Sequence, residues 1–169
     1  MYYTYYKSPL GNIALTANDK SLTALTFIGG KDGTGEKIEG NIPLLIPEGY
    51  QENPEKFTQV CQQLTEYFIG ERKKFDTLLA ATGTPFQKKV WHALCKIKQG
   101  ETKTYAWLAK KINNEKAVRA VGSANGANPI ALIVPCHRVI GSNGKLTGYA
   151  GGLALKAKLL MHEGALFKP

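Results

Sequence analysis

Near residues 80–83 the secondary structure that the sequence predicts changes from mainly strands to mainly helices. This change restricts the possible folds more than any other feature of the chain. Before it, three runs rich in aromatic and β-branched residues predict strands separated by short turns: Tyr2–Lys7, Asn12–Thr16 and Leu22–Phe27. A glycine-rich loop over Gly29–Gly40 and a helix over Pro54–Ile69 are predicted next. The first half therefore predicts a small antiparallel sheet with one helix.

After this boundary the pattern becomes helical. Thr84 followed by Pro85 predicts a capped helix start. Three more helices are predicted, and the first two are joined so tightly that they indicate a helix-turn-helix: Thr104–Ile112, Glu115–Ala124 and Leu153–His162. We expect an α+β fold with an N-terminal α/β domain over residues 1–80 and a mainly helical C-terminal domain over residues 81–169.

The charge changes sign at the same boundary. Residues 1–80 carry 8 Lys/Arg and 10 Asp/Glu, a net charge of −2, whereas residues 81–169 carry 14 and 3, a net charge of +11. A basic surface of this kind favours a polyanionic partner, because lysine and arginine displace the counterions of phosphates. Charge serving only solubility would be spread evenly, so we favour nucleic acid as the partner.

The cysteine pattern indicates a reducing environment. The three cysteines, Cys61, Cys95 and Cys136, are far apart and odd in number, which predicts neither a disulfide framework nor a zinc site. The N-terminus lacks the features of a signal peptide, and no apolar run approaches the roughly 20 residues of a membrane span. We expect a cytoplasmic protein that needs no membrane, associated with the nucleoid in a prokaryote.

Cys136 and His137 are adjacent, between two short apolar runs that predict an ordered position. A thiol is nucleophilic as thiolate, and an imidazole is the side chain best suited to remove its proton. The pair therefore predicts a reactive cysteine, although an unpaired cysteine can also serve only as a small core residue. A cysteine hydrolase is one alternative, but such enzymes usually bring the histidine from far away in sequence.

The helix predicted over Glu115–Ala124 has one long side chain, Arg119, among residues that are nearly all small at its centre. A smooth surface of this kind suits close approach to a nucleic-acid backbone, with the arginine free to enter the base stack. A helix packed against neighbours on both sides would select the same small residues. The sequence alone leaves both interpretations open.

Several segments resemble, in order, the O6-alkylguanine-DNA alkyltransferases, proteins that remove alkyl groups from guanine. The central match is Pro135-Cys136-His137-Arg138-Val139. The likeness is dense from Gly83 to Gly164 and includes these further segments: Gly83-Thr84-Pro85-Phe86-Gln87, Val90-Trp91, Gly100-Glu101-Thr102, Thr104-Tyr105, Ala117–Gly122, Asn128-Pro129, Gly148–Leu153 and Leu159–Glu163. The resemblance also implies a ribonuclease-H-like N-terminal domain.

The resemblance implies a catalytic set. Cys136 would accept the alkyl group, His137 would act as base through a water, and Glu163 would orient the imidazole. Asn128 would hold the active-site loop, and Tyr105 would donate a hydrogen bond toward guanine.

It also implies contacts with the flipped base. Tyr149, the Ala150 amide, the Val139 carbonyl and Trp91 are expected to bind it. Some family members carry serine where this chain has Ala150, so the backbone amide would serve there.

The implied partner is double-stranded DNA containing alkylated guanine. Arg119 would enter the duplex after nucleotide flipping, and the other expected DNA contacts are Thr84, Ala117, Val118, Ala120, Gly122 and Ser123. The protein would act once, as a monomer without cofactor or metal, with cooperative binding and repair of alkylated thymine as further expectations. The alternative is a non-catalytic protein that recognises alkylguanine; such relatives lack the acceptor cysteine.

Overall fold

The computed structural model describes residues 1–28 and 46–168, so the predicted loop over Gly29–Gly40 lies outside the described residues. The predicted antiparallel strands are present as β1 (Tyr2–Ser8), β2 (Gly11–Ala17) and β3 (Leu22–Phe27). A short strand, β4 (Gln51–Glu52), pairs in parallel with β1, which gives the sheet order β3-β2-β1-β4. Two residues are too few to show a strand pattern in sequence.

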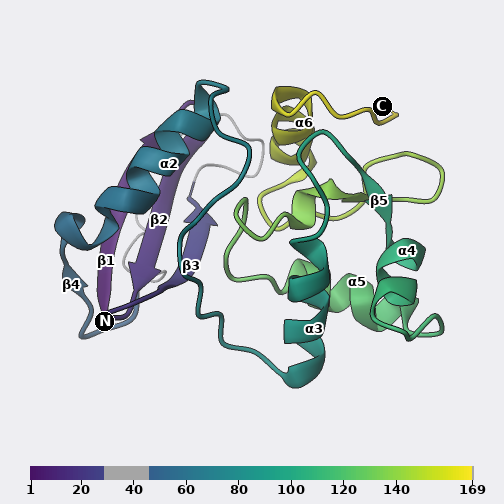
Figure 1. Ribbon diagram of the computed structural model, residues 1–169, viewed down its shortest axis with the longest axis horizontal. Coiled ribbons are helices and arrows are strands. Elements are labelled where there is room, and N and C mark those ends of the chain that lie inside the picture. Colours follow the sequence, from purple (N-terminus) through teal and green to yellow (C-terminus); the bar gives the residue numbers. More distant parts are fainter. Residues whose placement is uncertain (29–45, 169) are drawn as a thin grey trace.

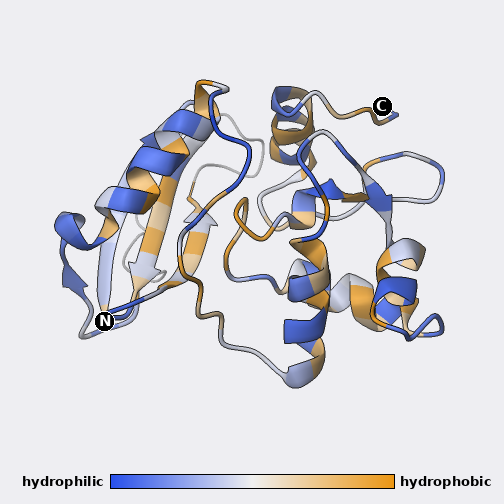
Figure 2. Cartoon of the chain, viewed as in Figure 1, coloured by the Kyte–Doolittle hydropathy of each residue, from blue (hydrophilic) through white to orange (hydrophobic). Residues whose placement is uncertain are grey.

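One helix covers a face of this sheet (Figure 1). The predicted helix over Pro54–Ile69 divides into a 3₁₀ turn, η1 (Pro54–Phe57), and α2 (Thr58–Phe68). The side of α2 that carries Val60, Leu64 and Tyr67 is buried, and Figure 2 shows its apolar colouring turned toward the strands. Burial of this stripe holds the helix against the sheet.

The second part of the chain is mainly helical. It contains α3 (Pro85–Leu94), α4 (Tyr105–Lys111), α5 (Val118–Gly126) and α6 (Leu153–His162). A two-stranded parallel ladder joins β5 (Lys103–Thr104) to β6 (Val139–Ile140).

The helix starts follow local chemistry. α3 begins where predicted, because the Thr84 hydroxyl accepts a hydrogen bond from the Gln87 amide while the Gln87 side chain accepts one from Thr84. α4 and α5 pack together across a short turn, in the order of a helix-turn-helix. α5 begins at Val118, later than predicted, because Asn114 and Ala117 are joined in a turn.

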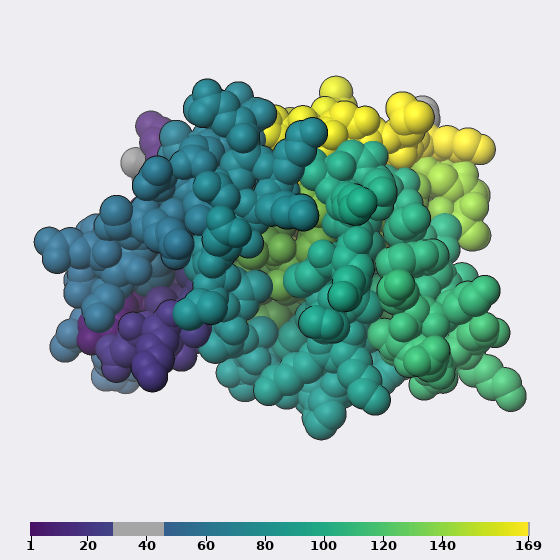
Figure 3. Space-filling view, viewed as in Figure 1, coloured from purple at the N-terminus to yellow at the C-terminus, as the bar shows by residue number. Residues whose placement is uncertain are grey.

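Both parts contribute to one apolar core, which extends from Ile13 in β2 to Leu159 in α6. Figure 3 shows atoms of the two parts meeting across the face drawn there. The outer edge of β3 is also engaged: Leu25 pairs with Pro129 and Ala131, and Leu22 pairs with Leu78 and Ala80. The sheet is thereby fastened to the segment that precedes Cys136.

Candidate active site

Cys136 opens a short 3₁₀ turn, η2 (Cys136–Arg138), directly after Pro135. The residue is 6 % exposed and lines a cavity. The cavity walls come from the end of β3, the end of α5 with Asn128, and the glycine-rich segment before α6: Leu25, Thr26, Phe27, Asn125, Gly148, Tyr149, Ala150 and Gly151 are among them. The sheet thus forms part of the wall around the thiol.

The surroundings of Cys136 favour the neutral thiol. Burial raises the pKa of Cys136 above its ordinary value, against the opposing effects of the hydrogen bond with Asn128 and the charge of Lys156. A protonated thiol is a poor nucleophile, so a reaction at this sulfur requires a base.

His137, the next residue, is the candidate for that base. Its side chain is fully buried, and Nε2 lies 3.0 Å from Glu163 Oε2, whereas Nδ1 has no hydrogen-bond partner within residues 1–28 and 46–168. Nε2 therefore carries the hydrogen that faces the carboxylate, and Nδ1 is free to accept a proton. Burial lowers the pKa of His137, which keeps the imidazole neutral near pH 7.

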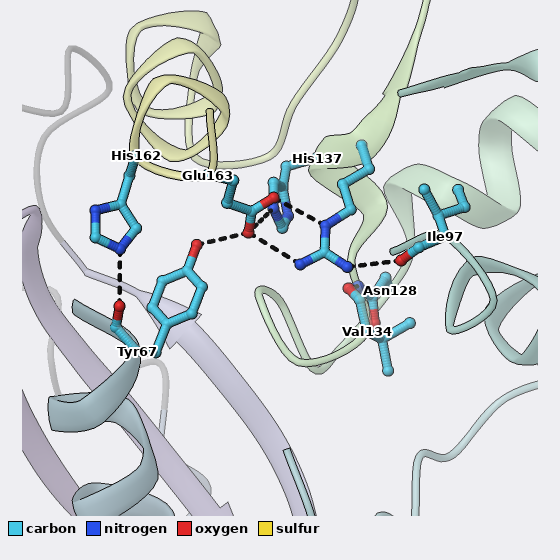
Figure 4. A network of polar contacts seen from close by, with 8 residues as sticks. Tyr67, Ile97, Asn128, Val134, His137, His162 and Glu163 are labelled. Atoms are coloured by element: carbon cyan, nitrogen blue, oxygen red, sulfur yellow. Dashed lines mark hydrogen bonds and ion pairs between the residues drawn. The ribbon is translucent and has the colours of Figure 1, made fainter. Parts of the chain in front are cut away.

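Glu163 caps the C-terminal end of α6 and accepts hydrogen bonds on both carboxylate oxygens (Figure 4). Arg138 donates from Nε to Oε1 over 2.8 Å and from Nη2 to Oε2 over 3.0 Å, and the Tyr67 hydroxyl donates to Oε2 over 2.6 Å. Burial alone would raise the pKa of Glu163, but the bonds and charges of His137 and Arg138 outweigh it and hold this pKa well below its usual range. A charged carboxylate is thus fixed beside the imidazole.

Two asparagines hold the segment around Cys136. The Asn128 side chain donates to the Val134 carbonyl over 2.7 Å and accepts from the Ile130 amide over 3.0 Å. Asn125, at the end of α5, donates to the Cys136 carbonyl over 3.4 Å. The predicted loop-holding contact of Asn128 is therefore present, whereas Asn125 was not foreseen.

Two family models cover nearly the whole chain. The ribonuclease-like domain of 6-O-methylguanine DNA methyltransferase matches residues 1–81, and the DNA-binding domain of the same protein matches residues 85–165.

The chain belongs to the 6-O-methylguanine DNA methyltransferase family.

Relatives in this family match over almost their full length. A methylated-DNA–protein-cysteine methyltransferase of Methanosarcina acetivorans is 52% identical over 98% of this chain and 99% of its own. The constitutive enzyme of Bacillus subtilis is 43% identical over 99% and 98%. The crystal structure of the Mycobacterium tuberculosis O6-methylguanine methyltransferase, 42% identical, superposes with a TM-score of 0.82 over 96% of this chain and 92% of that one. The crystal structure of the M. tuberculosis protein in complex with DNA superposes with a TM-score of 0.84. It is 41% identical and covers 97% of this chain and 93% of that one.

The residues expected to bind the base in this methyltransferase are partly gathered at the cavity. Tyr149 and Ala150 line it, and the buried Tyr149 hydroxyl has no partner in the described part of the chain. The Tyr105 hydroxyl lies beside this segment instead, where it accepts a hydrogen bond from Thr147 over 3.0 Å. The Val139 carbonyl already accepts a bond of 2.6 Å from Lys156.

Trp91, also expected to bind the base, is not among the residues that line this cavity. Its side chain is 5% exposed, packs in the core and donates from Nε1 to the Ala124 carbonyl over 2.8 Å. The ring also lies against Gly83, where a Cβ would approach it to 2.4 Å. An indole that joins α3 to α5 in this way is a packing residue.

Trp91→Phe is therefore expected to reduce the free energy of unfolding by about 1–2 kcal/mol, because one buried carbonyl loses its donor and a small void opens. Urea denaturation measures this loss. Methyl transfer by the folded fraction should remain at the wild-type rate; a selective loss of transfer would return Trp91 to the substrate site.

Most of the residues expected to meet DNA lie on α5 or directly before it. Val118, Arg119, Ala120 and Ser123 are exposed there, while Ala117 and Gly122 are partly buried. Thr84 is exposed at the start of α3, where its hydroxyl serves as the helix cap. Among residues 1–28 and 46–168, α5 packs against α3 and α4, and the side that carries Arg119 stays exposed.

Three residues of the site were missed in the sequence. Tyr67 and Arg138 anchor Glu163, and Lys156 is buried with its ammonium group donating to the carbonyls of Val139 and Thr147. Burial lowers the pKa of Lys156 to about 8. Lys156 falls at an apolar position of the helical pattern, and a lysine there is a usable signal of a buried polar role.

Proposed function

We propose that this protein repairs DNA by transferring the alkyl group of O6-alkylguanine to its own Cys136. The observation that carries the proposal is the buried Cys136 at a cavity, followed directly by a neutral His137. Nε2 of this histidine faces the Glu163 carboxylate. The curated relatives are named methylated-DNA–protein-cysteine methyltransferases, which is the same activity.

The proposed reaction balances within the site. The thiol proton passes through one water to Nδ1 of His137, and Glu163 stabilises the imidazolium that forms. The sulfur attacks the alkyl carbon, a carbon–sulfur bond forms, and the bond from that carbon to the guanine oxygen breaks. Guanine leaves as an anion and takes up the proton held by the His137 imidazolium, which returns the imidazole to its neutral form. The thioether has no good leaving group, so each molecule acts once.

The base must leave the duplex to reach this cavity, because the reacting carbon lies inside the base stack. We assign DNA contact to the outer side of α5, which is exposed and nearly free of long side chains apart from Arg119. The charge of +11 over residues 81–169 supports a DNA partner, and the M. tuberculosis relative has been crystallised with DNA.

Arg119→Ala tests the flipping role. The guanidinium would fill the space left by the flipped nucleotide, so its loss should slow transfer from duplex DNA by roughly 10- to 100-fold while sparing the free modified base. Rates on a methylated duplex and on free O6-benzylguanine measure this difference. Equal rates for Arg119→Ala and wild type on both substrates would remove Arg119 from the flipping step.

The proposal has further parts. A division at residues 80/81 is supported by the limits of the two family models. We also propose a monomer that can bind DNA cooperatively, repairs alkylated thymine and resides with DNA in the cytoplasm, where the three free thiols would remain reduced. Within the described residues, the helices are too short or too polar for a bilayer span, and no three metal-ligating side chains converge.

The decisive experiment is the intact mass of the protein after mixing with duplex DNA that carries one O6-methylguanine. We expect a gain of one methyl group per protein, located on Cys136 by peptide mapping and ending at a one-to-one ratio. Tight binding without a gain in mass would indicate the non-catalytic recognition protein. Absence of both would favour a hydrolase.

A further inference from the structure

Tyr67 reaches the proposed catalytic centre from the sheet side of the molecule. It belongs to the last turn of α2, is 1% exposed, and donates its hydroxyl to Glu163 Oε2 over 2.6 Å, although the two residues are 96 positions apart in sequence. Figure 4 shows its ring between α2 and the end of α6. Among the described residues, no other side chain before position 80 forms a hydrogen bond with His137 or Glu163.

The main chain of the same residue is engaged as well. His162 Nε2 donates to the Tyr67 carbonyl over 2.8 Å, and the two rings lie 4.9 Å apart. Since His162 and Glu163 are consecutive, Tyr67 forms hydrogen bonds with two successive residues at the end of α6. The position of the Glu163 carboxylate therefore depends on where α2 lies.

The hydroxyl also affects the charge of the carboxylate. Oε2 of Glu163 accepts from three donors, and the bond from Tyr67 is shorter than those from His137 and Arg138, which are both 3.0 Å. Burial and the neighbouring Glu163 raise the pKa of Tyr67, so this hydroxyl keeps its proton and donates throughout the working pH range. A neutral donor at Oε2 reduces the negative charge that His137 experiences.

We propose that Tyr67 is a positioning residue for alkyl transfer, through which the N-terminal part of the chain fixes Glu163 and thereby sets the basicity of His137. This inference rests on the proposed function, in which His137 takes the proton of Cys136. It gives the sheet and α2 a part in the reaction, in addition to their part in the core.

The groups that face this pair come from several elements. In the described part of the chain, the charged or hydroxyl-bearing side chains that influence His137 and Glu163 belong to η2, α6, α2 and the glycine-rich segment. They are Arg138, Lys156, Tyr67 and Tyr149, with Cys136 beside them. Tyr67 is the one whose hydroxyl can be removed without changing a formal charge or the cavity wall.

Tyr67→Phe is the test, because it keeps the ring and removes only the hydroxyl. Without this donor, the charge on Oε2 acts more strongly on His137, whose pKa should rise. A larger share of His137 is then protonated near neutrality and cannot accept the thiol proton. We expect single-turnover transfer at pH 7 to be about three- to tenfold slower, with the acid limb of the pH profile moved to higher pH and the loss shrinking as pH rises.

Tyr6→Phe is the matched control. It removes a tyrosine hydroxyl that bonds to Thr65 on the same helix over 2.8 Å, at a position outside the site. Its rate and pH profile should equal those of the wild type. Affinity for DNA, measured by fluorescence anisotropy, should be unchanged in both variants, because α2 carries none of the proposed DNA contacts.

A double-mutant cycle with His137→Gln completes the test, since glutamine can still donate to Glu163 but is not a base. If Tyr67 acts through His137, adding Tyr67→Phe to His137→Gln should slow residual transfer no further. Equal slowing in both backgrounds, or an unmoved pH profile, would overturn the inference and leave a structural role. Failure of the wild-type protein to take up methyl would instead refute the proposed function.

Discussion

Cys136→Ser is expected to reduce methyl uptake by roughly 10⁴-fold or more while leaving DNA affinity unchanged. A hydroxyl is a far weaker acid than a thiol, and the adjacent base, His137, has a pKa lowered by burial. Serine would therefore remain protonated beside the alkyl carbon. The thiol is 6% exposed, and the substitution changes its volume little, so the fold should be retained.

Cys95→Ser provides the control. Cys95 is an exposed free thiol at the end of α3, whereas Cys136 is buried, so simple accessibility would make Cys95 the more reactive cysteine. We expect Cys95→Ser to take up one methyl group at the wild-type rate. Intact mass after a single turnover on methylated duplex DNA separates the two variants; uptake by Cys136→Ser would place the acceptor at another residue.

Glu163→Gln is expected to lower the free energy of unfolding at pH 7 by about 3–5 kcal/mol, the usual cost of breaking a buried ion pair from one side. The substitution leaves the Arg138 guanidinium buried without a negative partner, because its other hydrogen bond among the described residues goes to the neutral Ile97 carbonyl, at 2.7 Å. Transfer should fall as well, because the imidazolium of His137 loses its counter-charge.

The pH dependence of this loss has a defined sign. The pKa of Glu163 is lower in the folded than in the unfolded chain, so its stabilisation is complete above the unfolded value and decreases as pH falls toward the folded one. The difference in the free energy of unfolding between wild type and Glu163→Gln should therefore become smaller below about pH 4.5. Urea unfolding from pH 7 to pH 3 measures it, and a constant gap would show that Glu163 contributes through packing alone.

Local chemistry explains which parts of the fold were predictable. Thr84 and Pro85 mark the start of α3 in sequence, because a helix cap is made by residues three positions apart. The adjacency of Cys136 and His137 is likewise visible in the sequence. Cys95, by contrast, has the spacing of a core residue in the helical pattern of the sequence, but it lies just past the end of α3 and is exposed.

The rest of the site depends on contacts between distant segments. Tyr67 has the apolar spacing of an ordinary core residue on α2, and nothing near it in sequence indicates that its hydroxyl reaches Glu163. Arg138 was part of the recognised motif, yet its partner is 25 residues away. A single chain shows residue types and spacing, but pairings of this kind appear only when the chain is folded.

The fastening of β3 to the segment before Cys136 affects how the protein can be stored. A protein consumed in its own reaction must be held in reserve as intact copies, and an open strand edge would let those copies add to one another. Here the peptide groups of Leu22 and Leu25 are occupied by Leu78, Ala80, Pro129 and Ala131, while the opposite edge is the two-residue strand β4. The contacts of Leu25 that help to wall the cavity thus also occupy part of the β3 edge to which another strand could add.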